Sequence, residues 1–255
     1  MKIYILIAVS FITIISSCKK PINESSIPTL EGIITMIDEN NRITKDYSGI
    51  NISCQNLNMT NINVDNEGKF NIPDIANDQA YLKLNVAKSG YGTTTVYFRK
   101  SYLDSCKTQG NSPSITLLPV STVKVNSLAG VIHGDFFKIS YAVTLTKAIA
   151  TNGVRFLLMK NNPQVSHNNF IYNNNTSKTW IAPVNAGNNE YLFCYKQTFN
   201  CNCDFLFPGD TVYIKAYGES NTHFGNTYLN LETGLLTFPS INTNDSPPTI
   251  SFIVP

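Results

Sequence analysis

The sequence predicts an all-β protein built from two β-sandwich domains in tandem. Short runs of β-branched and aromatic residues recur along the chain, and clusters of Asn, Asp, Ser and Gly separate them, which is typical of strands joined by turns. No stretch keeps a helical periodicity for more than a turn or two. Charged residues make up only 14% of the chain. Asn, Thr and Ser, which favour turns and β-edges over helices, must therefore form much of the solvated surface.

The length of 255 residues and the net charge of +2 limit the organisation of the chain and the class of partner. The length fits two domains of ordinary size. We expect a signal peptide at 1–17, a tether at 18–28, a first sandwich at 29–118 and a second sandwich at 119–255. The small net charge gives no basic surface of the kind that nucleic acid requires, so we expect no nucleic-acid partner.

The first element is an apolar leader that ends at a cysteine. Lys2 precedes an apolar run at 3–15, which is long enough for a secretory signal and too short to span a membrane. The two serines before Cys18 resemble the end of the lipobox found in bacterial lipoproteins. The resemblance implies that the leader is removed and that Cys18 carries fatty acids, palmitate among them, which anchor the chain to a membrane. A plain secretory signal with a cysteine nearby is the alternative.

A polar, proline-containing tether is expected to follow Cys18 as far as Pro28. Surface-exported lipoproteins of some Gram-negative groups are reported to carry acidic residues directly after the cysteine, whereas this chain has Lys19 and Lys20 there. We therefore expect lipid attachment at the outer membrane of the cell envelope, on either the periplasmic face or the cell surface. The membrane is thus one expected partner.

The first domain is predicted to contain strands at 30–37, 50–55, 61–64, 69–72, 81–87, 94–99 and 114–118. The hairpin at Gly68 sends the apolar residues Phe70 and Ile72 to one side, and a second glycine turn lies at Gly90. These features resemble the carboxypeptidase regulatory-like family of transthyretin-type sandwiches, from which the Asn-rich segment 38–49 departs. The resemblance implies a non-catalytic spacer or interaction domain.

The second domain is predicted to contain strands at 120–125, 136–144, 153–159, 169–172, 179–182, 190–196, 210–218, 226–230, 235–238 and 249–254. The segment 207–218 resembles the Pro-Gly signature of bacterial fibronectin type III domains, with Tyr213 at the tyrosine-corner position. In the same resemblance, 153–156 matches an earlier strand and 225–229 matches the strand that closes the sheet. Adhesion, glycan contact and mere spacing are all compatible with that fold.

The remaining cysteines are read as disulfide candidates, because the envelope outside the cytoplasm permits disulfides. For Cys54 and Cys106, a bond within the first domain is the first interpretation, and two unpaired thiols are the second. A hairpin would place Cys194 opposite Cys201 or Cys203, which favours a short-loop disulfide and leaves one thiol over. Zinc would need a fourth ligand and usually shows paired cysteine knuckles, so we expect no metal.

Catalytic motifs are missing from the sequence, so we expect no enzyme and no cofactor. His133, His167 and His223 are dispersed and are expected to be solvated loop residues. The acidic segments 38–41 and 65–68 could offer oxygen ligands to calcium, but turns use the same residues, and we expect turns.

Trp180 is the only tryptophan and is expected to lie in a core. The alternative is a sugar-stacking platform formed by Trp180, Tyr172 and the Asn-rich segment 168–175. The sequence thus favours a lipid-anchored, non-enzymatic envelope protein that binds or presents to another envelope component, either a protein or a glycan. A spacer subunit of an envelope complex and a carbohydrate-active enzyme whose carboxylates leave no local signature are the alternatives.

Overall fold

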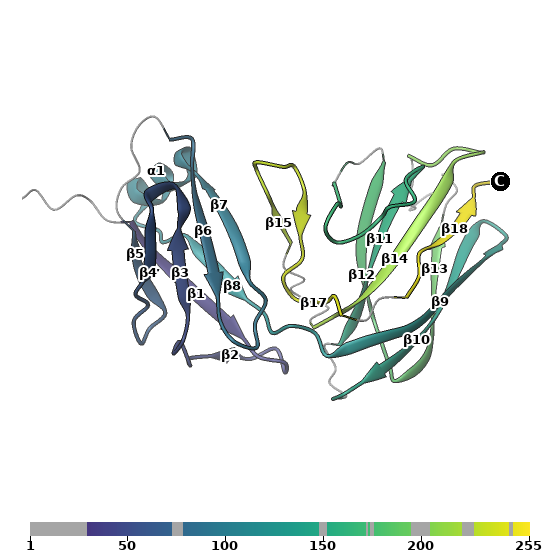
Figure 1. The fold of residues 1–255 in the computed structure, drawn as a ribbon, viewed down its shortest axis with the longest axis horizontal. Coiled ribbons are helices and arrows are strands. Elements are labelled where there is room, and N and C mark those ends of the chain that lie inside the picture. Colours follow the sequence, from purple (N-terminus) through teal and green to yellow (C-terminus); the bar gives the residue numbers. More distant parts are fainter. Residues whose placement is uncertain are drawn as a thin grey trace, which may run out of the picture.

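The computed structural model describes residues 30–72, 79–147, 152–171, 173, 176–194, 205–220, 227–244 and 247–255. Strands dominate this part of the chain, which confirms the all-β prediction. They gather into two groups of sheets that lie side by side, and a hairpin lies between them (Figure 1). No helix within these residues combines the length and the apolar character needed to cross a membrane.

The first group, called the first sandwich, has two facing sheets. Its strands are β1 (Leu30–Ile37), β2 (Ile43–Thr44), β3 (Asn51–Cys54), β4 (Met59–Ile62), β5 (Lys69–Ile72), β6 (Tyr81–Ala87), β7 (Thr94–Arg99) and β8 (Ser114–Leu117). One sheet has the order β2-β1-β5, with β8 parallel to β1, and the other has the order β4-β3-β6-β7. Leu82, Leu84 and Val86 of β6 are buried between the sheets while the residues between them are half-buried, as the predicted alternation requires.

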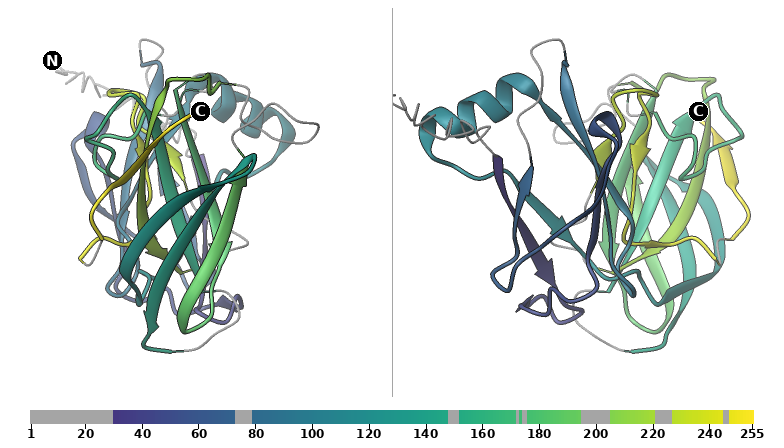
Figure 2. Two further views of the ribbon diagram at one scale, coloured as in Figure 1. Left: turned by 90° about the vertical axis from the view of Figure 1, so that its right-hand side faces the viewer. Right: turned by 60° about the vertical axis from the view of Figure 1, so that its left-hand side comes forward.

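A ten-residue helix, α1 (Lys100–Gln109), corrects the expectation that this domain has no helix. It follows β7 and lies at the opposite end of the first sandwich from β2 (Figure 2). Lys100 and Asp104 form an ion pair of 3.0 Å one turn apart, and Gly110 ends the helix with a φ of 68°. Only Leu103 and Cys106 are buried, so the apolar stripe was too short to give a periodic signal.

The second sandwich also has two facing sheets. Its strands are β9 (Val123–His133), β10 (Phe136–Leu145), β11 (Gly153–Lys160), β12 (Ser177–Pro183), β13 (Gly187–Cys194), β14 (Thr211–Glu219), β17 (Ile241–Asn242) and β18 (Ile250–Ile253). One sheet has the order β13-β10-β9, and the other has β12-β11-β14, with β17 and β18 both paired to β14. The chain thus passes from β9 and β10 in one antiparallel sheet to β11 and β12 in the other, returns to the first sheet at β13 and crosses again at β14, which is the arrangement of immunoglobulin-like sandwiches.

Two details of this sandwich differ from the sequence prediction. Val212 faces the core, whereas Tyr213 lies on the opposite face of β14, so Tyr213 does not occupy the inward corner position. The strand that completes the sheet is β18 rather than residues 225–229. The segment that contains Tyr228 leaves the sandwich and contacts the first one instead.

Both faces of the sheet formed by β11 and β14 are covered. Val154, Phe156 and Leu158 point into the core between the sheets, while Leu157 and Met159 belong to a separate buried cluster on the outer face. Phe170 from the loop after β11, Phe238 from the segment before β17 and Tyr217 of β14 also belong to that cluster. Two-sided burial explains why β11 is apolar throughout instead of alternating.

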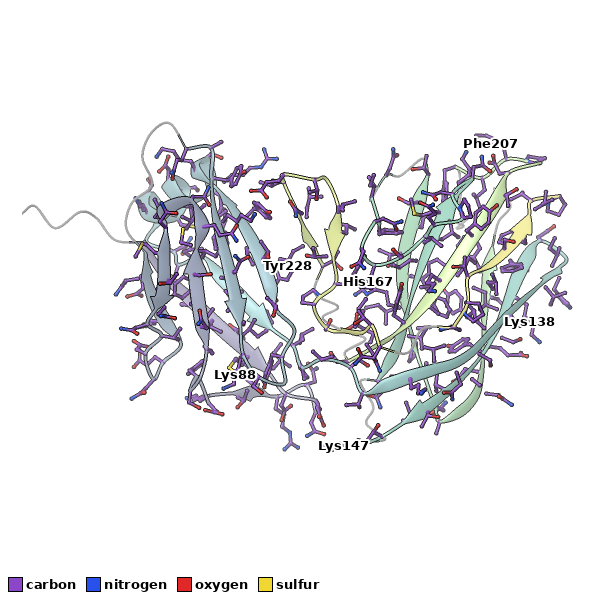
Figure 3. The ribbon with its side chains drawn as sticks, viewed as in Figure 1. Lys88, Lys138, Lys147, His167, Phe207 and Tyr228 are labelled. Carbon is purple, nitrogen blue, oxygen red and sulfur yellow. The ribbon has the colours of Figure 1, made fainter. Side chains whose placement is uncertain are left out.

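A junction joins the two sandwiches. The hairpin of β15 (Tyr228–Leu229) and β16 (Leu236–Thr237) belongs to the C-terminal half of the chain but packs against β7 (Figure 1). Tyr228 lies between the two sandwiches (Figure 3), and its hydroxyl donates a hydrogen bond of 3.0 Å to the carbonyl oxygen of Thr116. A Cβ on Gly92 would lie 1.6 Å from the carbonyl oxygen of Pro239, so only glycine fits at this close approach.

Candidate functional site

A shallow groove lies on the first sandwich between two loop segments, 45–51 and 61–66, and we call it the Tyr47 groove. It consists of two hollows that share Tyr47, Ser48 and Val64. The first, the Asn hollow, has a volume of about 200 Å³. Its other lining residues are Gly49, Ile50, Asn51, Asn61, Ile62 and Asn63. The second, the Asp hollow, has a volume of about 290 Å³ and is further lined by Lys45, Asp46, Asp65 and Asn66.

Tyr47 is held in place at the centre of the groove. Its ring is half-buried and packs against the core of the first sandwich. The ring also lies over Gly68, where an added Cβ would come within 2.7 Å of two ring carbons. Gly68 has a φ of +82°, so the same glycine makes the turn before β5 and leaves room for the aromatic ring. Tyr47 is therefore a fixed aromatic surface shared by both hollows.

Amide groups dominate the Asn hollow. The side-chain nitrogen of Asn51 donates a hydrogen bond of 3.1 Å to the side-chain oxygen of Asn61. Asn61 has a φ of 58°, a left-handed conformation that Asn tolerates better than most residues. Within the described residues, this bond leaves the Asn51 oxygen and the Asn61 nitrogen free. The hollow thus offers an acceptor and a donor side by side.

The Asp46 carboxylate is built into the wall of the Asp hollow. Its Oδ1 accepts hydrogen bonds from the Ser48 hydroxyl at 2.5 Å and from the Ser48 backbone nitrogen at 3.2 Å. These bonds, with the charge of Lys88 3.5 Å from Oδ2, hold the pKa of Asp46 below its ordinary value. Lys88 also bonds the Ser48 carbonyl oxygen, and Figure 3 shows Lys88 at the end of the sandwich where β2 lies. Asp46 is therefore ionised at neutral pH.

Asp65 forms the opposite wall of the Asp hollow. Its Oδ1 accepts hydrogen bonds of 2.8 Å each from the backbone nitrogens of Lys69 and Glu67, and the bond from Lys69 is the main reason that the pKa of Asp65 is lowered. The backbone nitrogen of Gly68 and the charge of Lys69 lower the pKa of Asp65 further. The same turn-forming bonding occurs at Asp38, whose Oδ1 accepts from the backbone nitrogens of Asn40 and Arg42. The predicted turns are thus confirmed at both segments.

The two carboxyl groups of the Asp hollow do not have the properties of a glycosidase's general acid. A glycosidase needs one carboxyl group that is protonated at the working pH. The pKa values of both Asp46 and Asp65 are lowered, so neither carboxyl group is a proton donor near neutrality. Among the residues that the structure describes, no three His, Cys, Asp or Glu side chains lie together as metal ligands.

Trp180 is half-buried and packs against the core of the second sandwich. Its ring stacks on Phe156 at 5.2 Å, on Phe193 at 5.1 Å and on Tyr191 at 5.7 Å between centroids. These aromatic rings close the side of the second sandwich between β12 and β13. The ring of Trp180 thus contacts three other aromatic rings, and Tyr172, the other aromatic residue of the alternative platform, lies outside the described residues.

Cys54 and Cys106 are both free and buried, so the first interpretation, a disulfide between them, is wrong for this structure. Cys54 lies in the core between the sheets, and burial raises the pKa of its thiol. Cys106 lies on α1, beside Tyr102 one turn earlier. Each thiol packs as a small apolar side chain. Cys18, Cys201, Cys203 and the side chain of Cys194 lie outside the described residues.

The histidines have different surroundings, although all three were expected to be solvated. His133 is exposed, and His223 lies outside the described residues. His167 is half-buried, with its ring edge-on to Tyr217 at 5.2 Å between centroids. Burial, assisted by the charge of Lys215, lowers the pKa of His167 and keeps the imidazole neutral at pH 7. His167 is therefore a packing residue of the outer cluster.

Tyr47 was not selected from the sequence, because the segment 38–49 was considered only for its departure from the family pattern and for the acidic residues at 38–41. The usable signal was an aromatic residue between Asp46 and Ser48, followed within a few positions by asparagine. Neither loop alone shows the groove, since its two sides are about fifteen residues apart in the sequence. Only the pairing of β3 with β4 brings them together.

Comparison with known proteins assigns no family. No family model matches the chain, and no curated protein matches it. A solved structure of a candidate carbohydrate-binding protein from Bacteroides uniformis is 11% identical, with coverage of 89% of this chain and 98% of that one and a TM-score of 0.30. A DUF3823 family protein from Parabacteroides merdae is 9% identical, with coverage of 88% and 100% and a TM-score of 0.27.

A third solved structure contains the FN1–FN3 domains of chicken CNTN1. It is 9% identical to this chain, with coverage of 88% of this chain and 62% of that one and a TM-score of 0.26. At these identities and TM-scores, none of the three transfers a function to this chain. The function must therefore be argued from the Tyr47 groove itself.

Proposed function

We propose that this protein is a non-enzymatic carbohydrate-binding protein of the bacterial envelope, and that the Tyr47 groove is its binding site. The observation that carries the proposal is the position of Tyr47, which lines both hollows together with residues that bear amide and carboxylate groups. A sugar ring presents C–H groups on its faces and hydroxyl groups at its edge. The C–H groups would pack on Tyr47, and the hydroxyl groups would bond the surrounding oxygens and nitrogens.

The size of the groove supports a sugar over a larger apolar ligand. Sites for drug-sized ligands usually have volumes of about 300–1,000 Å³ and apolar linings. The two hollows, at about 200 and 290 Å³, are smaller and are lined largely by Asn, Asp and Ser. Each hollow therefore suits one ring of a hydroxyl-rich ligand.

The rest of the proposal concerns how the groove is presented. Cys18, through the lipobox resemblance, would fix the chain to the membrane, and the tether would set its reach. The junction between the sandwiches would hold them as one unit. Because a rigid junction also suits a spacer subunit, a spacing role without a ligand is the second candidate function.

A glycan array with the full chain in mild detergent tests the proposal. We expect the wild-type chain to bind at least one glycan and Tyr47→Ala to lose that binding. Tyr102→Ala is the matched control, since Tyr102 is an exposed tyrosine on α1 outside the groove. Asn61→Gly removes a hollow-lining amide while keeping the backbone conformation, so it weakens binding even if Tyr47→Ala disturbs folding. A wild-type chain that binds no glycan would favour the spacer role.

A further inference from the structure

We propose that the free edge of β9 is a self-association site, at which the β9 strand of a second copy of this chain pairs antiparallel about a two-fold axis through Gly130. The proposed contact lies on the second sandwich and does not depend on the Tyr47 groove. It rests on three properties of β9: its outer edge is unpaired, that edge carries no charge, and its sequence can pair with itself.

The unpaired edge belongs to the second half of β9. This strand ends the sheet of order β13-β10-β9, and beyond a bulge at Asn126 its residues 127–133 pair with β10 on one side. Within the described residues, no backbone group of 127–133 bonds a strand on the other side. All of these residues except Leu128 are exposed. The N–H and C=O groups that point away from β10 are therefore open to another strand.

The composition of this edge does not repel a neighbouring strand. Sheet edges are usually protected by a charge, a proline or a short length. The other edges of the second sandwich have such protection: β12 carries Lys178 and ends at Pro183, β13 carries Glu190, and β18 has only four residues. The segment 127–133 contains no Lys, Arg, Asp, Glu or Pro. It is therefore the edge at which a strand can be added.

The same segment can pair with itself. The bulge at Asn126 bounds it on one side, and the turn at Gly134, with a φ of 62°, bounds it on the other. Gly130 is its middle residue, so a two-fold axis through Gly130 pairs the whole of 127–133 with the same residues of a second copy. Residues directly opposite each other then lie on the same face of the combined sheet, as antiparallel pairing requires.

This pairing covers the apolar side chains that the edge leaves exposed. Ile132 lies opposite Phe137, a core residue, and so faces the core side of the sheet, yet it is 42% exposed. In the pair it meets Leu128 of the second copy. Val131, on the outer face, is 57% exposed and meets the smaller Ala129. Because burial of apolar surface favours association, the pairing is stabilised on both faces.

A second copy is the occupant because the segment matches itself in length, charge and side-chain size. A two-fold axis makes the contact closed, with one patch used by both copies. The turn between β9 and β10 lies at the end of the molecule away from the first sandwich (Figure 1), so a second copy can reach this edge without meeting that sandwich. The result is a continuous sheet that runs through two copies.

Sedimentation of the full chain in density-matched detergent measures the association. We expect a reversible equilibrium between monomer and dimer for the wild type. Val131→Lys should weaken the dimer by roughly tenfold or more, because it sets two ammonium groups at diagonal positions across the axis. Leu192→Lys is the matched control and should leave the equilibrium unchanged. Leu192 is 56% exposed and lies opposite Lys138 like Val131, hence on the same face, but it belongs to β13.

Disulfide cross-linking tests the register. Ala129 of one copy should lie opposite Val131 of the other, so a mixture of Ala129→Cys and Val131→Cys chains should form linked dimers on mild oxidation. Each variant alone should link less, because a residue faces its own counterpart only when the axis passes through that residue. The wild-type chain gives the background from the native cysteines.

A wild-type chain that stays monomeric at every concentration up to its solubility limit would overturn the proposal and leave the edge to a strand of another protein. A dimer that Val131→Lys does not weaken, or that Leu192→Lys weakens equally, would overturn the β9 edge as the contact. Stronger linking by either cysteine variant alone than by the mixture would overturn the axis through Gly130.

Discussion

Lys83 on β6 and Glu232 at the tip of the β15–β16 hairpin form an ion pair, with 2.6 Å between Nζ and Oε2. The hydroxyl groups of Tyr81 and Tyr97 also reach the Glu232 carboxylate, at 3.3 Å each. A carboxylate from the C-terminal half of the chain is thus bound by three side chains of the first sandwich. A second ion pair joins Glu39 to Lys147 at 2.7 Å across the same pair of sandwiches.

The first prediction concerns the pH dependence of this junction. Lys83 holds the pKa of Glu232 below its ordinary value of 4.5. A lowered carboxyl pKa stabilises the folded state above pH 4.5, and the stabilisation is lost as the pH falls through the folded-state pKa. Glu232→Gln should therefore make the hairpin more accessible to protease at pH 7, and the difference from wild type should vanish near pH 3. If the hairpin of Glu232→Gln were as much more accessible to protease than that of the wild type at pH 3 as at pH 7, the Glu232 charge would not hold the hairpin.

The second prediction concerns two buried tyrosines. Burial raises the pKa of Tyr228 and of Tyr141 to about 12. A raised pKa means that the unfolded chain ionises first, so each tyrosine withdraws roughly 2 kcal/mol of stability between pH 10 and 12. At pH 8, Tyr228→Phe should be less stable by about 1 kcal/mol, because the hydrogen bond to Thr116 is lost.

Comparing the stability of Tyr228→Phe with that of the wild-type chain at two pH values gives a sharp test. Near pH 12 the deficit of Tyr228→Phe should shrink or reverse, since phenylalanine cannot ionise. Denaturant unfolding at pH 8 and pH 11.5 measures the two differences, and tyrosinate absorbance should show two late ionisations in the wild-type chain. If Tyr228→Phe were less stable than the wild type by the same free energy at both pH values, the pKa of Tyr228 would not be raised.

The third prediction concerns Gly68 beneath Tyr47. Gly68→Ala forces a Cβ against the tyrosine ring, whereas Gly90→Ala, at an almost identical φ of +80°, meets nothing within 4 Å. Both variants share the cost of a left-handed alanine, about 1 kcal/mol. Only Gly68→Ala should also displace Tyr47 and weaken glycan binding. Equal effects of the two substitutions on binding would show that the position of the ring does not depend on Gly68.

The fourth prediction concerns the proposed anchor. Radiolabelled palmitate should be incorporated into the wild-type chain and not into Cys18→Ser, and the variant should leave the membrane fraction. Cys54→Ser is a useful control, because Cys54 is buried in the core and should not affect labelling. Labelling that survives in Cys18→Ser would refute lipidation at this residue.

Strand positions were predictable wherever one face of a sheet is solvated, as β6 illustrates. A strand was also predicted at 153–159, where β11 lies, although its residues do not alternate because both of its faces are buried. The helix α1 was missed because two buried residues, Leu103 and Cys106, give too little periodicity. The sequence singled out Trp180, which packs on other aromatic rings, and did not single out Tyr47, which lines a groove that exists only once two segments are paired. A local sequence pattern therefore predicts individual strands. A site made from separate segments of the chain can be recognised only once the fold is known.

The most direct measurement of the central claim is the affinity of the full chain for an oligosaccharide selected from the array, determined by calorimetry for the wild type, Tyr47→Ala and Tyr102→Ala. The account predicts saturable binding by the wild type and by Tyr102→Ala, and at least a tenfold loss for Tyr47→Ala. Undiminished binding by a folded Tyr47→Ala would contradict the claim that this groove is the site.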